Sequence, residues 1–360
     1  MSVVYKKLED VCEILDSRRV PITAKDRKAG AFPYYGANGL QDYVADYIFD
    51  DELVLLAEDG GNFGSKERPI AYRVSGKCWV NNHAHVLKAK PNMHVDYLCY
   101  ALMFYDTEGL VNGATRQKLT QAAMRQMVIP YRDMTEQLQI IEKISQIVRA
   151  IEKRKEELQL LDQLVKSRFI ELFGDPEQNP MVWTKQPLSE IIINANNGMA
   201  RRGNDPHGSI VMRLVELQDG HIDYSTPNRI VLTDTEKGKY LLRENDFLFA
   251  RVNGNPEYVG RCAVFHEIGE PVYHNDHIIR VHFDDTVLNG AFASALINSA
   301  YGKRQMRGQI KTSAGQYTIS QDGIGAITAI LPPMALQQQF AAFVEQTDKS
   351  KLCSKMEVAA

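Results

Sequence analysis

The chain has 360 residues, of which 44% are hydrophobic and 24% are charged. These proportions are those of an ordinary globular protein and leave room for about two domains. With 42 Lys and Arg against 45 Asp and Glu, the net charge is −3, which argues against a small protein that coats nucleic acid through phosphates alone but allows a local basic face.

The first globular part, residues 1–134, contains short apolar runs separated by Gly, Asn and Asp turns. These runs predict strands at 53–57, 78–80 and 85–87, and a helical pattern follows at 95–105. Strands and helices in this order indicate an α+β domain.

A long helix is predicted next, over residues 135–173, where apolar residues recur with alternating steps of four and three. This is the pattern of a coiled-coil seam, although one long helix on a globular core is an alternative. We expect Thr135 to cap the helix, Gly174 and Pro176 to end it, and its length to be roughly 57 Å. The predicted seam residues are Ile140, Ile144, Ile147, Ile151, Leu158, Leu161, Val165 and Leu172.

The second globular part, residues 174–334, is again α+β, with strands predicted at 210–214, 247–250 and 278–281 and a helix at 291–299. A second and shorter helix is predicted over residues 335–360. Its seam would be Leu336, Phe340 and Phe343, and the polar Thr347 and Ser350 follow in the next turns.

The two globular parts look like diverged copies of each other. Residues 51–57 match 244–250, 82–86 match 275–278, and 119–121 match 319–321. Residues 129–130 and 136–138 then match 331–332 and 338–340, at an offset of 202. This order predicts a pseudo-two-fold internal repeat, with two similar domains separated by long helices that pair as an antiparallel coiled coil.

This organisation resembles the specificity subunits of type I restriction–modification systems. The likeness covers nearly the whole chain and is strongest in FPYYGANG at 32–39, KSRFIELFGDP at 166–176, and ARVNG at 250–254 with YVGR at 258–261. It implies two target-recognition domains, each of which reads one part of a bipartite, asymmetric double-stranded DNA site. The helices would dock two methyltransferase (modification) subunits, and restriction subunits would join the complex. S-adenosylmethionine, ATP and Mg²⁺ would act in those partners, so that this chain would be non-catalytic and without a cofactor.

Candidate DNA contacts are the Arg, Lys, Asn and Gln side chains that can pair with base edges, and the cations and hydroxyls that can hold phosphates. For any single one of them, the alternative is a solvated surface group. In the first part they are Arg18, Arg19, Lys25, Arg27, Lys28, Tyr34, Tyr35, Asn38, Asn62, Lys66, Arg68, Arg116 and Lys118. In the second part they are Arg201, Arg202, Asn204, Arg251, Asn253, Asn255, Tyr258, Arg261, Lys303, Arg307, Lys311, Gln316 and Tyr317.

Two other functions remain as alternatives. Glu58, Asp59 and two glycines follow a predicted strand, as in the loop that binds S-adenosylmethionine, which would suit a self-contained adenine DNA methyltransferase. However, another strand-like run follows instead of a helix, and no Asn-Pro-Pro-aromatic motif occurs. The third possibility is a coiled-coil protein adaptor. The histidine pairs at 83/85 and 274/277 lack a third ligand at suitable spacing, so we expect no metal site.

The five cysteines form no Cys-x-x-Cys pair, so we expect neither a disulfide framework nor a zinc ribbon. The N-terminal residues contain acids where a signal peptide would need an apolar core, and no segment approaches the roughly eighteen uncharged apolar residues of a membrane span. We therefore expect a soluble cytoplasmic protein.

Overall fold

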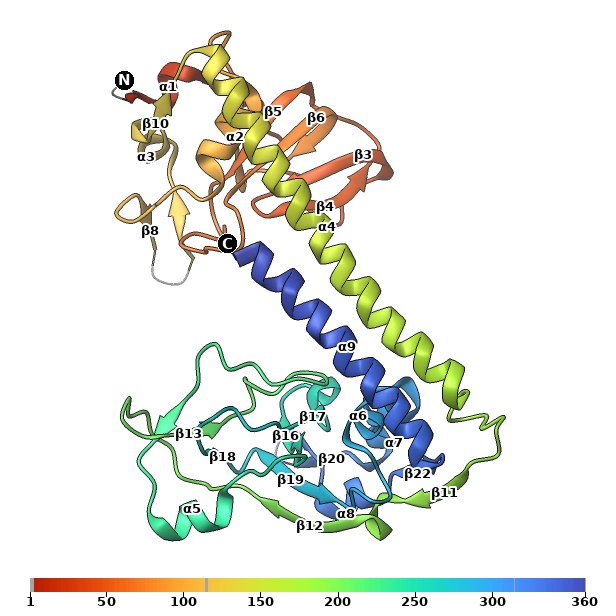
Figure 1. Ribbon diagram of the computed structural model, residues 1–360. Helices are drawn as coiled ribbons and strands as arrows, with labels where there is room; N and C mark the ends of the chain where they lie inside the picture. Colours follow the sequence, from red (N-terminus) through yellow and green to blue (C-terminus); the bar gives the residue numbers. More distant parts are fainter. Residues whose placement is uncertain (1–2, 114–115, 314, 360) are drawn as a thin grey trace. The chain divides into compact units, whose positions relative to one another are not determined.

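The computed structural model describes residues 3–113, 116–313 and 315–359 (Figure 1). The chain divides into two compact units, Met1–Glu152 and Lys153–Ala360, and helix α4 (Met134–Phe173) contributes to both. The four segments predicted from the sequence, with boundaries after residues 134, 173 and 334, therefore remain a prediction about the chain's organisation. None of the helices in the described ranges combines the length and apolar composition that a membrane span requires.

The first unit mixes strands with short helices, as predicted for residues 1–134. Its strands are β1 (Val4–Lys7), β2 (Cys12–Ile14), β3 (Ala29–Gly36), β4 (Gly39–Val44), β5 (Phe49–Ala57), β6 (Ala71–Val80), β7 (Ala84–Ala89), β8 (Val111–Asn112), β9 (Lys118–Leu119) and β10 (Val128–Tyr131). Its helices, besides α4, are α1 (Leu8–Val11), η1 (Asp16–Arg18), α2 (Val95–Met103) and α3 (Gln121–Gln126).

A six-stranded sheet with the order β2-β7-β5-β6-β3-β4 forms the centre of this unit. Neighbouring strands are antiparallel except β3 and β6, which are parallel. In β5, Leu53 and Leu55 pack into one hydrophobic cluster and Val54 and Leu56 into another, because successive side chains point to opposite faces. Both faces of β5 are therefore buried, which explains its continuous apolar sequence. Helix α2 contacts β5 and β6 (Figure 1).

The second unit contains more numerous and shorter strands. They are β11 (Thr184–Pro187), β12 (Ile192–Asn197), β13 (Ser209–Met212), β14 (Arg229–Ile230), β15 (Phe247–Ala250), β16 (Val252–Asn253), β17 (Cys262–Val264), β18 (Val272–His274), β19 (Ile278–Phe283), β20 (Lys311–Ser313), β21 (Gln316–Thr318) and β22 (Thr328–Leu331). The helices are η2 (Leu188–Glu190), α5 (Asp234–Tyr240), η3 (Pro256–Tyr258), α6 (Gly290–Asn298), α7 (Ala300–Gln309), α8 (Gln321–Gly325) and α9 (Met334–Ala359).

The strand orders show that the two units share a common plan. The antiparallel order β2-β7-β5-β6 in the first unit corresponds to β12-β19-β15-β17 in the second. Likewise, β1 pairs with β10 just before α4, and β11 pairs with β22 just before α9. The structure therefore supports the internal repeat and the α+β class predicted from the sequence.

A buried glutamine at the start of α4 ties this helix to the first unit. The side-chain oxygen of Gln137 accepts a hydrogen bond from the backbone N–H of His94 at 2.7 Å. Its amide nitrogen donates to the carbonyls of Asn92 at 3.0 Å and Arg132 at 2.8 Å. His94 is the residue that caps α2, so one side chain links the starts of two helices.

Gln337 makes the same three bonds at the start of α9. Its oxygen accepts from the N–H of Asn289 at 2.8 Å, and its nitrogen donates to the carbonyls of Val287 at 3.1 Å and Pro332 at 2.9 Å. Gln137 thus corresponds to Gln337, at an offset of 200 residues. The matches predicted at an offset of 202 were therefore wrong by two residues, because a short sequence match cannot fix which glutamine is buried.

Helix α4 begins at Met134, one residue before the predicted range, and its cap lies two residues before the predicted one. The side chain of Asp133, not Thr135, accepts a hydrogen bond from the N–H of Glu136, at 2.9 Å. An N-cap side chain satisfies one of the backbone donors that a helix start leaves unpaired, so Asp133 is the cap. The predicted end is confirmed: α4 stops at Phe173, and Gly174 has a positive φ of 73°.

Within the second unit, the end of α4 and the start of α9 run antiparallel. Phe340 of α9 packs against Phe169 and Phe173 of α4, with ring centroids 5.6 Å apart in both pairs. Further along α9, Lys351 forms a 2.9 Å ion pair with Asp162, which lies earlier in α4. Later residues of α9 thus meet earlier residues of α4, which establishes the antiparallel direction.

The buried residues of this helix pair match the predicted seam only in part: Phe340 of α9 is fully buried, as predicted, but the buried residues of α4 differ from those predicted. Phe169 and Phe173 are buried in the core of the second unit, whereas the predicted Val165 and Leu172 pack only at its border. In the first unit, Ile140 packs against the core, but Ile147 is 59% exposed. A strict heptad was therefore the wrong description of the segment near residue 169, because the helix there faces a globular core and presents a wider apolar face. For the other seam positions the coiled coil stays a prediction.

Candidate nucleic-acid interface

The cations predicted for the first unit lie mostly in its loops. Those of the loop between η1 and β3 and of the loop between β5 and β6 are the most accessible. Lys25, Lys28, Lys66 and Arg68 are exposed, and within the described ranges their side chains form no ion pair. Residues 114–115, which precede the predicted Arg116 and Lys118, lie outside the described residues.

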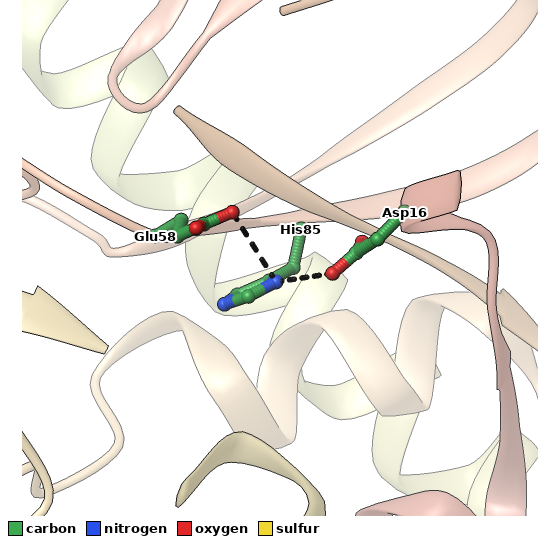
Figure 2. Close-up of side chains that lie close together, drawn as sticks. All are labelled: Asp16, Glu58 and His85. Atoms are coloured by element: carbon green, nitrogen blue, oxygen red, sulfur yellow. Dashed lines mark hydrogen bonds and ion pairs between the residues drawn. The ribbon is translucent and has the colours of Figure 1, made fainter. Parts of the chain in front are cut away.

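Three ionisable side chains meet where β5 ends, and we call them the Asp16–Glu58–His85 cluster. His85 Nδ1 lies 2.6 Å from Asp16 Oδ2 and 3.7 Å from Glu58 Oε2, and both carboxylates point toward the ring (Figure 2). His85 Nε2 lies 2.9 Å from the carbonyl oxygen of Leu119. Ligand atoms of the three side chains lie within 4.8 Å of one another, a spacing that a metal ion could bridge.

Two cations already occupy the surroundings of this cluster. Arg19 forms a 2.6 Å ion pair with Glu58, and Lys118 approaches the same carboxylate at 3.0 Å. A carbonyl accepts at His85 Nε2 and a carboxylate lies at Nδ1, so both ring nitrogens already have oxygen partners. The donor set therefore fits an internal ion-pair network better than a metal site.

The network perturbs both carboxylates in the same direction. Burial alone would raise the pKa of Asp16, but hydrogen bonds from His85, the N–H of Val86 and Gln121 hold that pKa below its usual value. Burial likewise opposes ionisation of Glu58, and the hydrogen bonds from Arg19 and Lys118 lower its pKa. Both side chains are thus stabilised as carboxylates in the folded unit.

Several residues predicted to contact DNA have structural roles instead. Tyr34 is 1% exposed, so its predicted DNA contact is wrong; its hydroxyl group donates to the carbonyl of Ile22 at 3.3 Å. Arg19 is held inside the fold by Glu58 and by the carbonyl of Ala84, at 2.8 Å, which disfavours a direct contact. Asn38 is exposed, and its amide donates to the carbonyl of Gly60 at 3.0 Å.

The remaining predicted residues of the first unit combine exposure with internal contacts. Arg18 donates to the carbonyl of Ile48 at 3.2 Å. Arg27 lies over the ring of Tyr34, with its guanidinium carbon 4.2 Å from the ring centroid. Arg116 pairs with Asp59 at 2.7 Å. Tyr35 is half-buried, and so is Asn62, whose amide donates to the carbonyl of Pro69 at 3.4 Å.

In the second unit, most predicted arginines form ion pairs with nearby acids. Arg201 pairs with Glu236 and Arg202 with Asp276, at 2.8 and 2.7 Å. Arg261 and Lys303 both pair with Asp219, at 3.2 and 2.8 Å, and Arg307 pairs with Glu257. Such exposed pairs are weak and can exchange partners, so they remain compatible with DNA contact.

The other predicted residues of this unit differ in what they can offer. The side chains of Asn253 and Asn255 accept hydrogen bonds from the N–H groups of residues 255 and 257, so they shape the loop at η3. Arg261 lies over the ring of Tyr258, and Tyr317 is half-buried against the core. Asn204, Lys311 and Gln316 are exposed, as are Asn255 and Tyr258.

Arg251 occupies the position in the second unit that Glu58 has in the first. The N–H of Glu58 donates to the carbonyl of His83 at 2.8 Å, and its own carbonyl accepts from the N–H of Leu119 at 2.7 Å. The N–H of Arg251 donates to the carbonyl of His277 at 2.8 Å, and its carbonyl accepts from the N–H of Ile319 at 2.9 Å. The same backbone position thus carries an acid in one unit and a base in the other.

The neighbours of this position correspond as well. Gln121 donates to Asp16 at 2.9 Å, and Gln321 donates to Asn197 at 3.2 Å. In the first unit, His85 is the cross-strand partner of Leu56. In the second unit, the corresponding residue is Ile279, the cross-strand partner of Phe249. The Asp16–Glu58–His85 cluster is therefore replaced in the second unit by Asn197, Arg251 and Ile279.

The sequence prediction included Arg251 but missed Asn197 and Gln321, and it missed Glu58 and Asp16 as partners of Arg19. The available signal was the match of residues 119–121 with 319–321. That match indicated a repeat, and it also places Gln121 and Gln321 at equivalent sites. No sequence pattern indicated that these glutamines reach Asp16 and Asn197, since those residues lie more than one hundred positions away along the chain.

Comparison with known proteins shows which proteins this chain is similar to. The domain described as "Type I restriction modification DNA specificity domain" matches residues 2–161. The StySPI specificity subunit of Salmonella potsdam is 24% identical over 311 residues, which cover 82% of this chain and 67% of that protein. The EcoKI specificity subunit of Escherichia coli is 23% identical over 248 residues, covering 65% of this chain and 53% of that protein.

A crystal structure of the S subunit of a type I restriction–modification system from M. genitalium has a similar fold. Its TM-score is 0.58 at 13% identity, and the alignment covers 100% of this chain and 92% of that one. The chain spans between about half and two thirds of the length of the curated relatives named above. The matched domain and these relatives thus show that the chain is similar to specificity subunits of type I restriction–modification systems, and the solved structure shows that it shares their fold.

Proposed function

We propose that this chain recognises DNA in a type I restriction–modification complex and that each unit reads one part of a bipartite, asymmetric site. The observation that carries the proposal is the repeat. The two units share the same strand order and the same backbone frame around Glu58 and Arg251, yet they carry different side chains there. Two domains with the same backbone arrangement but different side chains at equivalent positions suit a DNA site with two different recognition segments.

The helices supply the contacts to the partner proteins in this proposal. A groove of about 390 Å³ runs along α4 in the second unit, and Leu160 and Leu164 in its lining are 56% and 49% exposed. Exposed leucines of a long helix are typical of surfaces that a partner protein covers. We propose that modification subunits dock on these helices and that restriction subunits join the assembled complex.

Catalysis belongs to the partner subunits in this proposal. The loop after β5, which is similar in sequence to an S-adenosylmethionine loop, leads to β6 and not to a helix, and Glu58 in it is paired with Arg19 and Lys118. Both observations count against cofactor binding by this loop. S-adenosylmethionine would act in the modification subunits, and ATP and Mg²⁺ in the restriction subunits.

Footprinting of the chain with its modification subunits on DNA tests the proposal. Two protected segments separated by an unprotected gap are expected, since each unit covers its own half-site. A single continuous footprint would contradict separate reading by two units, and no footprint would favour a protein adaptor. In a parallel assay with labelled S-adenosylmethionine, methyl transfer by the pure chain would contradict the non-catalytic role and favour the self-contained methyltransferase.

A further inference from the structure

The second unit contains a polar cavity of about 410 Å³ beside Arg251. It lies where β12 and β15 end and where β21 leads into α8. Its lining residues are Asn197, Arg251, Lys311, Thr318, Ile319, Ser320, Gln321 and Asp322.

Arg251 is held in a defined orientation beside this cavity. Its Nε donates to the carbonyl of Asp276 at 2.5 Å, and the side chain is half-buried. Within the described ranges, no carboxylate forms an ion pair with Arg251 or with the exposed Lys311. The Nε edge of the guanidinium group is thus anchored, and the charges of both side chains remain available to a ligand.

The chemistry of the lining fits an oxyanion. Arg251 and Lys311 bring two positive charges, and Asn197, Thr318 and Ser320 add an amide and two hydroxyl groups. One carboxylate, that of the exposed Asp322, also lines the cavity, so the local charge is +1. Arg, Lys, hydroxyl and amide groups are the side chains that bind DNA phosphates.

The shape of the site favours a phosphate over a base edge. Base edges lie at the floor of a groove and are read by side chains that protrude into it, whereas phosphates project from the backbone and fit a concave site. We propose that this cavity binds one backbone phosphate in the half-site of the second unit. This inference rests on the proposed function, because it assumes that DNA is the ligand.

The first unit has no equivalent site at this position in its described residues. Glu58 stands where Arg251 would be, and Arg19 and Lys118 neutralise it from within the fold. Asp16 and His85 complete the network there. The phosphate contact would therefore belong to one half-site only. The binding of the two units to DNA would then depend differently on the salt concentration.

The test measures binding of the full chain, assembled with its modification subunits, to a pool of duplex oligonucleotides at several salt concentrations. Lys311→Ala removes one cation from an exposed side chain and should leave the fold intact, and Arg251→Ala removes the anchored one. Lys237→Ala is the matched control, since it removes an exposed charge from α5. Each cavity variant should weaken binding roughly tenfold on all sequences alike. Each should also lower the slope of log K against log salt by about 0.9, while the control changes neither quantity.

Asp322→Asn supplies a test with the opposite sign. Removal of this negative charge should tighten binding roughly threefold if a phosphate occupies the cavity, because the carboxylate then no longer repels it. An unchanged affinity and salt slope in Lys311→Ala and Arg251→Ala would overturn the phosphate site. A loss in Arg251→Ala confined to one base pair would assign base reading instead and would equally overturn it. Absence of DNA binding by the unmodified complex would refute the proposed function itself, which separates the two failures.

Discussion

Replacement of Gln337 by Met is expected to destabilise the second unit by about 3 kcal/mol. The two side chains have similar volume, so no cavity forms, but Met cannot hydrogen-bond. The change leaves three backbone groups without their partner, namely the N–H of Asn289 and the carbonyls of Val287 and Pro332. A buried polar group left unpaired costs about 1–3 kcal/mol, and the lower figure applies three times because two of these residues are partly exposed.

Gln339→Met is the matched control, because Gln339 lies on the same helix and is exposed. Its effect should stay within about 0.5 kcal/mol. Gln137→Met should repeat the large effect in the first unit, since Gln137 makes the same three bonds there. Gln337 is the counterpart of Gln137 if the offset between the units is 200, and Gln339 is its counterpart if the offset is 202. The effects of the two substitutions therefore distinguish the two offsets.

Hydrogen exchange with mass spectrometry is the suitable assay, because it reports the opening free energy of each unit separately and a chain with two units has no single unfolding free energy. Protection should fall in β15 and β19 for Gln337→Met, and in β5 and β7 for Gln137→Met. Equal losses for Gln337→Met and Gln339→Met would refute the reasoning, as would a loss below about 1 kcal/mol for Gln337→Met.

Two further predictions concern the core and the buried ion pairs. Phe340→Ala should lower the opening free energy of the second unit by about 3–5 kcal/mol in hydrogen exchange, because the ring is fully buried against Phe169 and Phe173. A cost near that of an exposed residue would show that the helix pair is not part of this core. The lowered pKa values of Asp16 and Glu58 mean that their stabilisation of the first unit is complete above the ordinary values of 3.8 and 4.5 and is lost as the pH falls through the lower folded values. The opening free energy of that unit, measured by hydrogen exchange with correction for the pH dependence of the chemical exchange rate, should fall between about pH 6 and 2.5, and Asp16→Asn should reduce this fall. An identical pH profile in the variant would contradict the assignment.

Local sequence patterns were sufficient to predict the two long helices and several central strands. The run Leu53–Ala57 reads as a strand because five consecutive apolar residues bounded by polar ones suit a strand buried on both faces, and it forms the end of β5. The spacing of apolar residues predicted α4 to within two residues at its start, and the glycine at 174 marked its end. These features depend on neighbours in the chain, which a single sequence displays directly.

The roles of individual polar side chains depended on contacts that are distant in sequence. Tyr34 and Arg19 are candidates for DNA contact by residue type, yet the fold buries the first and pairs the second with Glu58. Glu58 and Arg251 follow similar strands, and only the tertiary structure shows that they are equivalent positions with opposite charge. Burial and ion pairing are properties of groups brought together by folding, so the tertiary structure alone decided which cations are held inside the protein and which remain available to a ligand.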